Sequence, residues 1–320
     1  MNDEKIVKRY FRKYTEGNSE ARAVRHKTSK PLSWKRIILY AVLILFAIWT
    51  LAPFFIIIVT SFTSQSEWLE ATGYIWWPKD FTFEGYERMF KADMGSVNGM
   101  PIILSGFLNT MWITLLPLVS GLIQSLLVAY CYWQHRFPFK NTLFIVTVSL
   151  MFVPLGAFGF VAYMFYDLLG WTEGFAAVLP LIIPGLFASA GTVFFLRPYL
   201  DGIGGEIVEA SRIDGMGFWQ IFIKIVIPLS KPALIAQFIF GFVGGYNNYA
   251  GALLYLEGEP ELWTLQLALQ QTIANLSSSG GSDYGFICAT AIMAMLPLIV
   301  LYLGCQKFFI EGIAFGGGKE

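Results

Sequence analysis

The sequence predicts an all-α polytopic membrane protein with six transmembrane helices and with both termini in the cytoplasm. Three observations lead to this fold class: an apolar composition, six long apolar segments, and an uneven distribution of Lys and Arg between the segments that connect them. Hydrophobic residues make up 56% of the 320 residues and charged residues 14%, whereas soluble domains have roughly 45–50% and about 25%. The composition therefore excludes a soluble domain.

Each of the six apolar segments is long enough to cross a bilayer, which takes about 20 residues of helix. None of them contains Asp, Glu, Lys, Arg or His. Prolines interrupt five of them, and the fifth is glycine-rich instead. Membrane helices tolerate such interruptions where neighbours satisfy the freed backbone groups, so we expect bent helices packed as a bundle. The segments are residues 37–62, 104–134, 141–166, 174–196, 232–256 and 284–306.

The distribution of basic residues predicts the orientation. If the N-terminus is inside, nineteen of the 22 Lys and Arg residues are cytoplasmic and three are exterior, which satisfies the positive-inside rule. Residues 1–36 then form a basic cytoplasmic tail, without the apolar core of a signal peptide, and 37–320 form the transmembrane domain. The other cytoplasmic segments are 135–140, 197–231 and 307–320, and the exterior ones are 63–103, 167–173 and 257–283.

Two exterior segments carry local signals. In 63–103 the sequence predicts a short helix from Glu84 to about Phe90 inside a small folded cap, although an aromatic anchor on the membrane surface explains the same residues equally well. In 257–283 the Ser- and Gly-rich stretch 275–282 is typical of a flexible linker.

The absence of charge from the six segments limits the function. Ionisable residues inside a membrane are costly and usually functional, and proton-coupled and many ion-coupled carriers require them. Their absence argues against a secondary carrier and against a charged solute bound by counter-ions in this chain. The three cysteines have no metal-ligand spacing. No phosphate-binding G-x-x-x-x-G-K-[ST] loop is present, so we expect no cofactor on this chain, and ATP and Mg²⁺ to be bound by a partner ATPase if transport is active.

The polar residues inside the segments are neutral. Amides hydrogen-bond hydroxyl groups and aromatic rings stack on the apolar faces of sugars, so this set suits a neutral polyhydroxy ligand. The alternative is hydrogen bonding between helices, which Asn and Gln also provide in membrane bundles. We favour that alternative for any one residue and the solute pathway for the cluster that follows the glycines of the fifth segment. The candidate pathway residues are Gln237, Tyr246, Asn247, Asn248 and Tyr249.

One polar stretch stands out in the apolar second half of the chain. Residues 206–217 predict a short helix from Glu206 to Ile213 that ends at Asp214-Gly215, where glycine can take the left-handed position after a helix. On this helix Glu206, Glu209 and Arg212 share one arc, because their spacing is i, i+3, i+6. An ordinary amphipathic loop helix would show the same pattern.

The spacing of this stretch resembles the EAA signature of binding-protein-dependent ABC importer permeases. The signature reads E-A-A-x3-G-x9-I-x-L-P, and here Glu209-Ala210-Ser211 is followed after three residues by Gly215 and after nine more by Ile225-Val226-Ile227-Pro228. Ser211 and Ile227 depart from it mildly. Further sequence segments, including Tyr246-Asn247-Asn248-Tyr249, are similar to those of the carbohydrate-uptake branch, to which the maltose permease pair belongs. The resemblance covers about 37–315.

The resemblance implies a type I ABC importer permease fold and a sugar-import function in the cell membrane. It implies a heterodimer with a second permease subunit, two ATPase subunits on the cytoplasmic side, an extracellular or periplasmic solute-binding protein, and no nucleic acid. The chain would be a transport subunit and not an enzyme. The coupling helix within 197–231 would contact the ATPase; its residues are Glu206, Glu209, Ala210, Ser211, Arg212, Asp214 and Gly215.

Three alternatives remain from the sequence. The cargo of an ABC permease could be a peptide, a polyamine or a phosphate ester, because the motif concerns the ATPase and not the solute. The chain could be a membrane scaffold that transports nothing. A secondary carrier is the weakest alternative for the charge reason given above.

Overall fold

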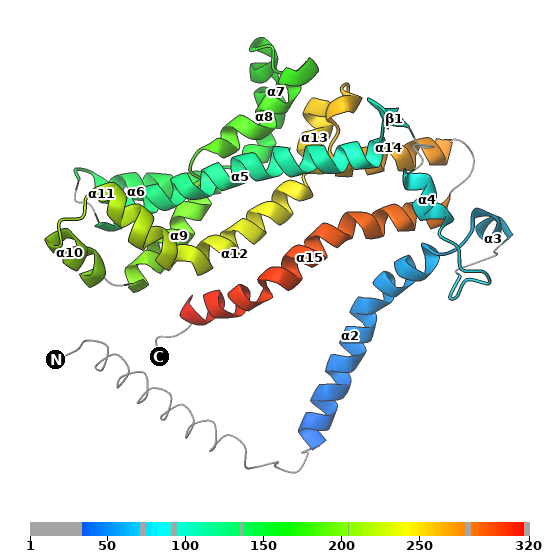
Figure 1. Cartoon of the computed structure of the whole chain (residues 1–320), viewed down its shortest axis with the longest axis horizontal. Helices are drawn as coiled ribbons and strands as arrows, with labels where there is room; N and C mark the ends of the chain where they lie inside the picture. Colours follow the sequence, from blue (N-terminus) through cyan, green and yellow to red (C-terminus); the bar gives the residue numbers. More distant parts are fainter. Residues whose placement is uncertain are drawn as a thin grey trace. The chain divides into compact units, whose positions relative to one another are not determined.

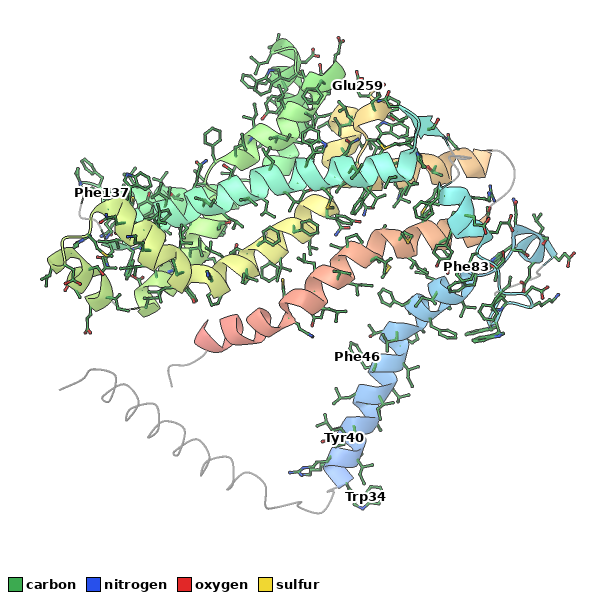
Figure 2. All side chains as sticks on the ribbon, in the orientation of Figure 1. Trp34, Tyr40, Phe46, Phe83, Phe137 and Glu259 are labelled. Atoms are coloured by element: carbon green, nitrogen blue, oxygen red, sulfur yellow. The ribbon has the colours of Figure 1, made fainter. Side chains whose placement is uncertain are left out.

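The computed structural model describes residues 34–70, 75–90, 95–134, 137–203, 205–278 and 283–316. Of the predicted tail 1–36, residues 1–33 lie outside the described residues. The chain divides into two compact units, residues 1–55 and 56–320. The described part of the first unit belongs to one apolar helix, α2 (Trp34–Thr60), whose side chains Trp34, Tyr40 and Phe46 point away from its axis in Figure 2.

Helices dominate the described residues of the second unit. After α2 the elements are α3 (Gln65–Glu70), α4 (Glu84–Phe90), the two-residue antiparallel strands β1 (Ser96–Val97) and β2 (Met100–Pro101), α5 (Ile102–Gln134), α6 (Lys140–Ser149), α7 (Gly159–Leu168), α8 (Leu179–Ile182), α9 (Ala190–Ile203), α10 (Glu206–Ile213), α11 (Phe218–Ile221), α12 (Ile227–Tyr246), α13 (Tyr249–Leu256), α14 (Leu265–Ser278) and α15 (Tyr284–Gly316). Short 3₁₀ turns lie at Leu150–Phe152, Leu155–Phe158, Gly174–Val178, Ile183–Leu186 and Pro260–Leu262, and a π-helical turn at Phe222–Val226.

The predicted number of spans is confirmed, and interruptions occur where prolines predict them. Five helical stretches of the described residues are long and apolar enough to cross a membrane, and a bent pair makes six. The bent pair is the third span, Lys140–Phe152 with Gly156–Leu168, which turns by 65° around Pro154. The fourth span, Gly174–Ile203, contains irregular turns before α9 begins.

The predicted bounds of the fifth span are wrong at both ends. The span begins at Phe218 and runs through the π-helical turn into α12. Pro228 and Pro232 lie within the first turns of α12 and do not interrupt the span. It ends at Tyr246, where Asn247 and Asn248 leave helical geometry and Asn248 caps α13 by accepting a hydrogen bond from the Gly251 amide (3.0 Å).

The expected short helix at 84–90 is confirmed as α4. The flexible linker at 275–282 is wrong for its first part, since residues 275–278 are the last turn of α14; residues 279–282 lie outside the described residues. The helix α14 was not predicted, because it is too short and too polar to be recognised as a membrane span.

Three buried clusters hold the second unit together. One surrounds Tyr130 and joins α5, α9, α10 and α11; one surrounds Tyr246 and Phe286 and joins α4, α5, α12, α14 and α15; and one surrounds Leu256 and joins α5, α8, α13 and α14. α5 contributes to all three, so it is the central helix of the unit. Figure 1 shows α10 and α11 near one end of α5 and α14 with β1 near the other.

An ion pair ties α4 to the start of α15. Arg88 contacts the carboxylate of Asp283, which is only 3% exposed, and its guanidinium lies 5.7 Å from the centre of the Phe286 ring. The other carboxylate oxygen of Asp283 accepts a hydrogen bond from the Phe286 amide (3.0 Å) and so caps α15. The predicted segment 63–103 is therefore folded onto the bundle through α4.

Candidate functional site

The helix that carries the EAA-like stretch is α10, and it packs on the bundle through a narrow face. Val208 is 1% exposed and belongs to the cluster around Tyr130, and Ser211, one turn further on, is also buried. The Ser211 hydroxyl donates to the carbonyl of Ile207 in its own helix (2.7 Å). The remaining residues of α10 are exposed, so most of its surface is available to a partner.

The turn after α10 has the hydrogen bonds of a Schellman motif. The amide of Met216 donates to the carbonyl of Ser211 (3.0 Å) and the amide of Gly215 to that of Arg212 (3.0 Å). Gly215 has φ +81°, a left-handed conformation that side chains with a Cβ disfavour. The sequence prediction of the helix end and of this glycine is confirmed. Met216 packs on the cluster around Tyr130, so the turn is anchored at its far side.

The exposed surface of α10 is both charged and apolar. Glu206, Glu209 and Arg212 are exposed as their spacing predicts, and so are Ala210 and Asp214. Ile213 is 87% exposed and Ile207 45%. Exposed isoleucines beside charges on a helix anchored on its other side form a surface suited to a protein partner.

A helical connection joins this element to the rest of the bundle. Phe218 and Phe222 stack around Tyr130 of α5, with ring centres 5.2 and 5.9 Å away. The π-helical turn Phe222–Val226 then leads into α12 without a break. The turn after α10 is therefore followed by one continuous helical stretch that ends with α12.

A cavity of about 1110 Å³ lies between α5, α12, the irregular part of the fourth span and the end of α6. Its polar lining includes the hydroxyls of Thr114, Ser189 and Thr192 and the amides of Gln237 and Asn248. Among the described residues that line it, none is Asp, Glu, Lys, Arg or His.

The α12 wall of the cavity is a stripe of one helical face. Gln237, Gly241 and Gly245 are four residues apart on α12, and Asn248 lines the cavity just beyond the end of this helix. A Cβ on Gly241 would lie 2.3 Å from Leu118 Cδ1, and one on Gly245 would lie 2.6 Å from Thr114 Cγ2. The two glycines thus allow α12 to approach α5 closely beside the cavity.

The five candidate pathway residues do not share one location. Gln237 and Asn248 line the cavity, and Gln237 has no hydrogen-bond partner among the described residues. Tyr246 is buried in the bundle and donates to the carbonyl of Ala294 (2.8 Å). Asn247 accepts from Gln266 (3.2 Å), and Tyr249 packs in the cluster around Leu256.

Other neutral polar groups that the sequence placed inside the spans connect helices. Asn109 donates to the carbonyls of Glu261 (2.8 Å) and Trp263 (3.1 Å), and Thr110 accepts from the amide of Leu265 (2.8 Å). The preference for interhelical hydrogen bonds at single residues is confirmed at these two positions.

The wall contributed by the fourth span was missed by sequence reasoning. Residues 184–185 and 187–193 line the cavity opposite the α12 stripe. The signal was present, since Pro180 and Pro184 predict an irregular span. Only the contacts of that irregular segment show that it faces a cavity.

Comparison with known proteins places this geometry in a family. Residues 121–314 match the family model described as "Binding-protein-dependent transport system inner membrane component". The chain is similar to a protein named as the arabinooligosaccharides transport system permease protein AraQ of Halalkalibacterium halodurans (28% identity, 92% of this chain and 100% of the relative). It is also similar to the protein of the same name from Bacillus subtilis (30% identity, 76% of this chain and 80% of the relative).

The fold is also found in a solved structure. A chain from the crystal structure of a bacterial ABC transporter involved in the import of the acidic polysaccharide alginate superposes with a TM-score of 0.74. The alignment covers 88% of this chain and 99% of the other at 24% identity, so it supports the type I ABC importer permease fold. Taken with the apolar spans and the α10 turn, the match over 121–314 shows that this multi-pass membrane chain belongs to the binding-protein-dependent transport system inner membrane component family.

Proposed function

We propose that this chain is the membrane-spanning permease subunit of an ATP-driven importer of neutral carbohydrates, in the oligosaccharide size range. The proposal rests on one observation above all: a cavity of about 1110 Å³ lined by amides, hydroxyls and apolar groups without an ionisable side chain among its described lining. Ligand pockets for small molecules measure about 300–1,000 Å³, so this cavity has room for more than a single sugar ring. The names of the similar permeases support the same solute class.

Solute recognition in this proposal depends on the α12 stripe. Gln237 faces the cavity with both its donor and its acceptor groups free among the described residues, and Asn248 retains its amide N–H groups after capping α13. Both can hydrogen-bond hydroxyl groups without placing a charge in the membrane. Tyr246, Asn247 and Tyr249 serve the pathway indirectly, since they hold the end of α12 in place.

Coupling to ATP hydrolysis depends on α10 and its turn. We propose that Glu206, Glu209, Ala210, Arg212 and Asp214 contact a cytoplasmic ATPase subunit, while Ser211 and Gly215 maintain the shape of the element. A movement of the ATPase is then transmitted from α10 through α11 to α12. It reaches the cavity because α11 and α12 belong to one continuous helical stretch, and α12 lines the cavity. ATP and Mg²⁺ are bound by the ATPase subunits and not by this chain.

The proposal includes three kinds of partner. A second permease subunit pairs with this chain, and the working unit is a heterodimer. Two ATPase subunits bind on the cytoplasmic side, and a solute-binding protein delivers the sugar from the exterior. The orientation with α10 inside follows from the positive-inside distribution of Lys and Arg.

The experiment measures uptake of radiolabelled saccharides by cells in which the chromosomal copy is replaced by variants. Gln237→Leu should raise the apparent KM for a neutral oligosaccharide by about tenfold, since it leaves solute hydroxyls unpaired at a cost of about 1–3 kcal/mol. Gln270→Leu, on the exposed side of α14, is the matched control and should transport normally.

Competition with unlabelled compounds tests the solute class in the same assay. Neutral oligosaccharides should compete, and peptides, polyamines and sugar phosphates should not. Competition by a peptide without competition by any saccharide would contradict the carbohydrate assignment, and normal uptake by Gln237→Leu would remove that residue from the pathway.

A further inference from the structure

An irregular stretch of backbone lies inside the fourth span, between Ile183 and Ser189. The turn Ile183–Leu186 is a single 3₁₀ turn, and Phe187 takes an extended conformation (φ −97°, ψ 168°) before α9 begins at Ala190. Within a membrane such backbone is tolerated only where protein or an aqueous cavity satisfies its polar groups. The backbone carbonyls and amides of this segment therefore need hydrogen-bond partners.

Three polar side chains of α5 hold it. Ser120 and Gln124 both donate to the carbonyl of Leu186, at 2.9 and 2.6 Å, and Gln124 also donates to the Ser120 hydroxyl (3.2 Å). Ser125 accepts from the amide of Ser189 (2.9 Å) and is fully buried. The carbonyl of Leu186 thus has both lone pairs occupied. The irregular segment is fixed at two positions, Leu186 and Ser189.

Close packing of glycines reinforces these hydrogen bonds. A Cβ on Gly121 would lie 2.6 Å from the carbonyl oxygen of Gly185 and 3.1 Å from that of Phe187. A Cβ on Gly185 would lie 2.8 Å from Pro117 Cβ. The irregular backbone therefore lies directly against α5, without intervening side chains.

The side chains that hold the segment do not line the cavity. Residues 184–185 and 187–193 of the fourth span line the cavity together with part of α5, whereas Ser120, Gln124 and Ser125 are not among the lining residues. We name these three residues the α5 clamp. They differ in this respect from Gln237, which faces the cavity.

We propose that the α5 clamp positions the cavity wall at residues 184–193 and so determines which neutral solutes the permease accepts, without contacting the solute. The clamp is a set of positioning residues: it sets the backbone of Gly185 to Ser189, and this backbone sets the width of the cavity. This inference rests on the proposed function for its solute, but the position of the wall can be measured without any solute.

The first test measures the wall directly. Cys131, Cys288 and Cys305 are replaced by Ala, and a single cysteine is introduced as Ala188→Cys, which lines the cavity. Its reaction rate with a polar methanethiosulfonate reagent is measured in membranes of the assembled importer. Gln124→Leu should change this rate about threefold, because Gln124 makes one interhelical hydrogen bond, to the Leu186 carbonyl, and such a bond in a membrane contributes about that factor.

Matched variants separate positioning from a general loss of structure. Ser120→Ala should change the labelling rate, and Ser120→Thr, which keeps the hydroxyl, should restore it. Ser149→Ala is the control, because its hydroxyl bonds only to the carbonyl of Ile145 in its own helix (2.8 Å). If Gln124→Leu does not accumulate in the membrane, the two variants at Ser120 and Ser125→Ala decide the result.

The second test measures selectivity with a series of melibiose, raffinose and stachyose, which differ in chain length. Clamp variants should alter the ratio of kcat/KM between the shortest and the longest sugar by about threefold or more, with receptor-stimulated ATPase activity retained. Unchanged labelling and an unchanged ratio in Gln124→Leu would overturn the proposal. If the wild type transports none of these sugars, the labelling result still decides the position of the wall, and the carbohydrate assignment fails by itself.

Discussion

The molecule interrupts its helices in two contrasting ways. At Asp214–Gly217 the turn after α10 satisfies its own backbone through a Schellman motif, and the charged side chains around it are exposed. At Ile183–Ser189 the backbone depends on side chains of α5, and no such motif is available. The difference follows from the surroundings: water can satisfy an exposed turn, whereas an irregular segment in a span needs a neighbouring helix. The first interruption is locally encoded and the second is a property of the packing.

Gly121→Ala tests the packed interruption and should have the largest effect. The new Cβ would press on the Gly185 carbonyl oxygen at 2.6 Å, where backbone and not a flexible side chain must move. Overpacking of this kind costs about 1–3 kcal/mol. A lower melting temperature of the purified complex, by several degrees, is the expected result.

Gly244→Ala is the control for that variant, because a Cβ there meets nothing within 4 Å. Equal melting temperatures for the two variants would show that the close approach of α5 to the fourth span does not matter for stability.

Gly215→Val tests the locally encoded interruption. A β-branched residue at φ +81° is strained by about 1–2 kcal/mol, and the turn that orients α10 should be lost. We expect uptake to fall at least tenfold while the amount of protein in the membrane stays normal. Transport is measured by uptake and insertion by immunoblot of membranes.

Gly217→Ala provides the comparison for this turn, since Gly217 has φ −76° and open space around it. It should transport normally. Uptake at the wild-type rate in Gly215→Val would contradict a coupling function for the turn.

Val208→Ala tests how strongly the buried face of α10 holds this helix on the bundle. The variant removes about two buried carbon atoms from the cluster around Tyr130, which costs about 1.6 kcal/mol. Coupling should weaken, visible as ATP hydrolysis that responds less to the solute-binding protein. Val146→Ala, the same substitution at an exposed position of α6, is the matched control and should couple normally; if both variants respond alike, the buried face of α10 does not anchor it.

Ser211→Ala should have the smallest effect of these variants. The Ser211 hydroxyl bonds back to the carbonyl of Ile207, an interaction that adds little to helix stability. Alanine at this position also restores the E-A-A part of the signature. Uptake and ATPase activity within about 20% of the wild type are expected, and a loss as large as that of Val208→Ala would show that the hydroxyl itself contacts the partner.

The two interruptions also show what the sequence can predict. The ends of α10 and the left-handed Gly215 were predicted, because Glu206, Glu209, Arg212 and the Asp-Gly pair carry local signals. The number of spans and the irregularity near Pro154 and Pro184 were predicted for the same reason.

The cavity and the division of the pathway residues could not be predicted. Tyr246 and Asn247 are adjacent in sequence, yet one is buried against α15 and the other pairs with α14, because the helix ends between them. The cavity wall depends on which carbonyl Gln124 and Ser120 reach, and that pairing joins residues 62 to 66 positions apart. Such a pairing leaves no periodic pattern in the sequence.

The ion pair between Arg88 and Asp283 has a consequence for the synthesis of the chain. The two residues are 195 positions apart, so at about 5–20 residues per second translation needs about 10–40 s after Arg88 is made before its partner exists. During that interval four further spans enter the membrane while α4 lacks its docking site. The pair can form only when α15 has been made, and the buried carboxylate then has its counter-ion. A chain truncated before Asp283 would lack this contact between α4 and the start of α15.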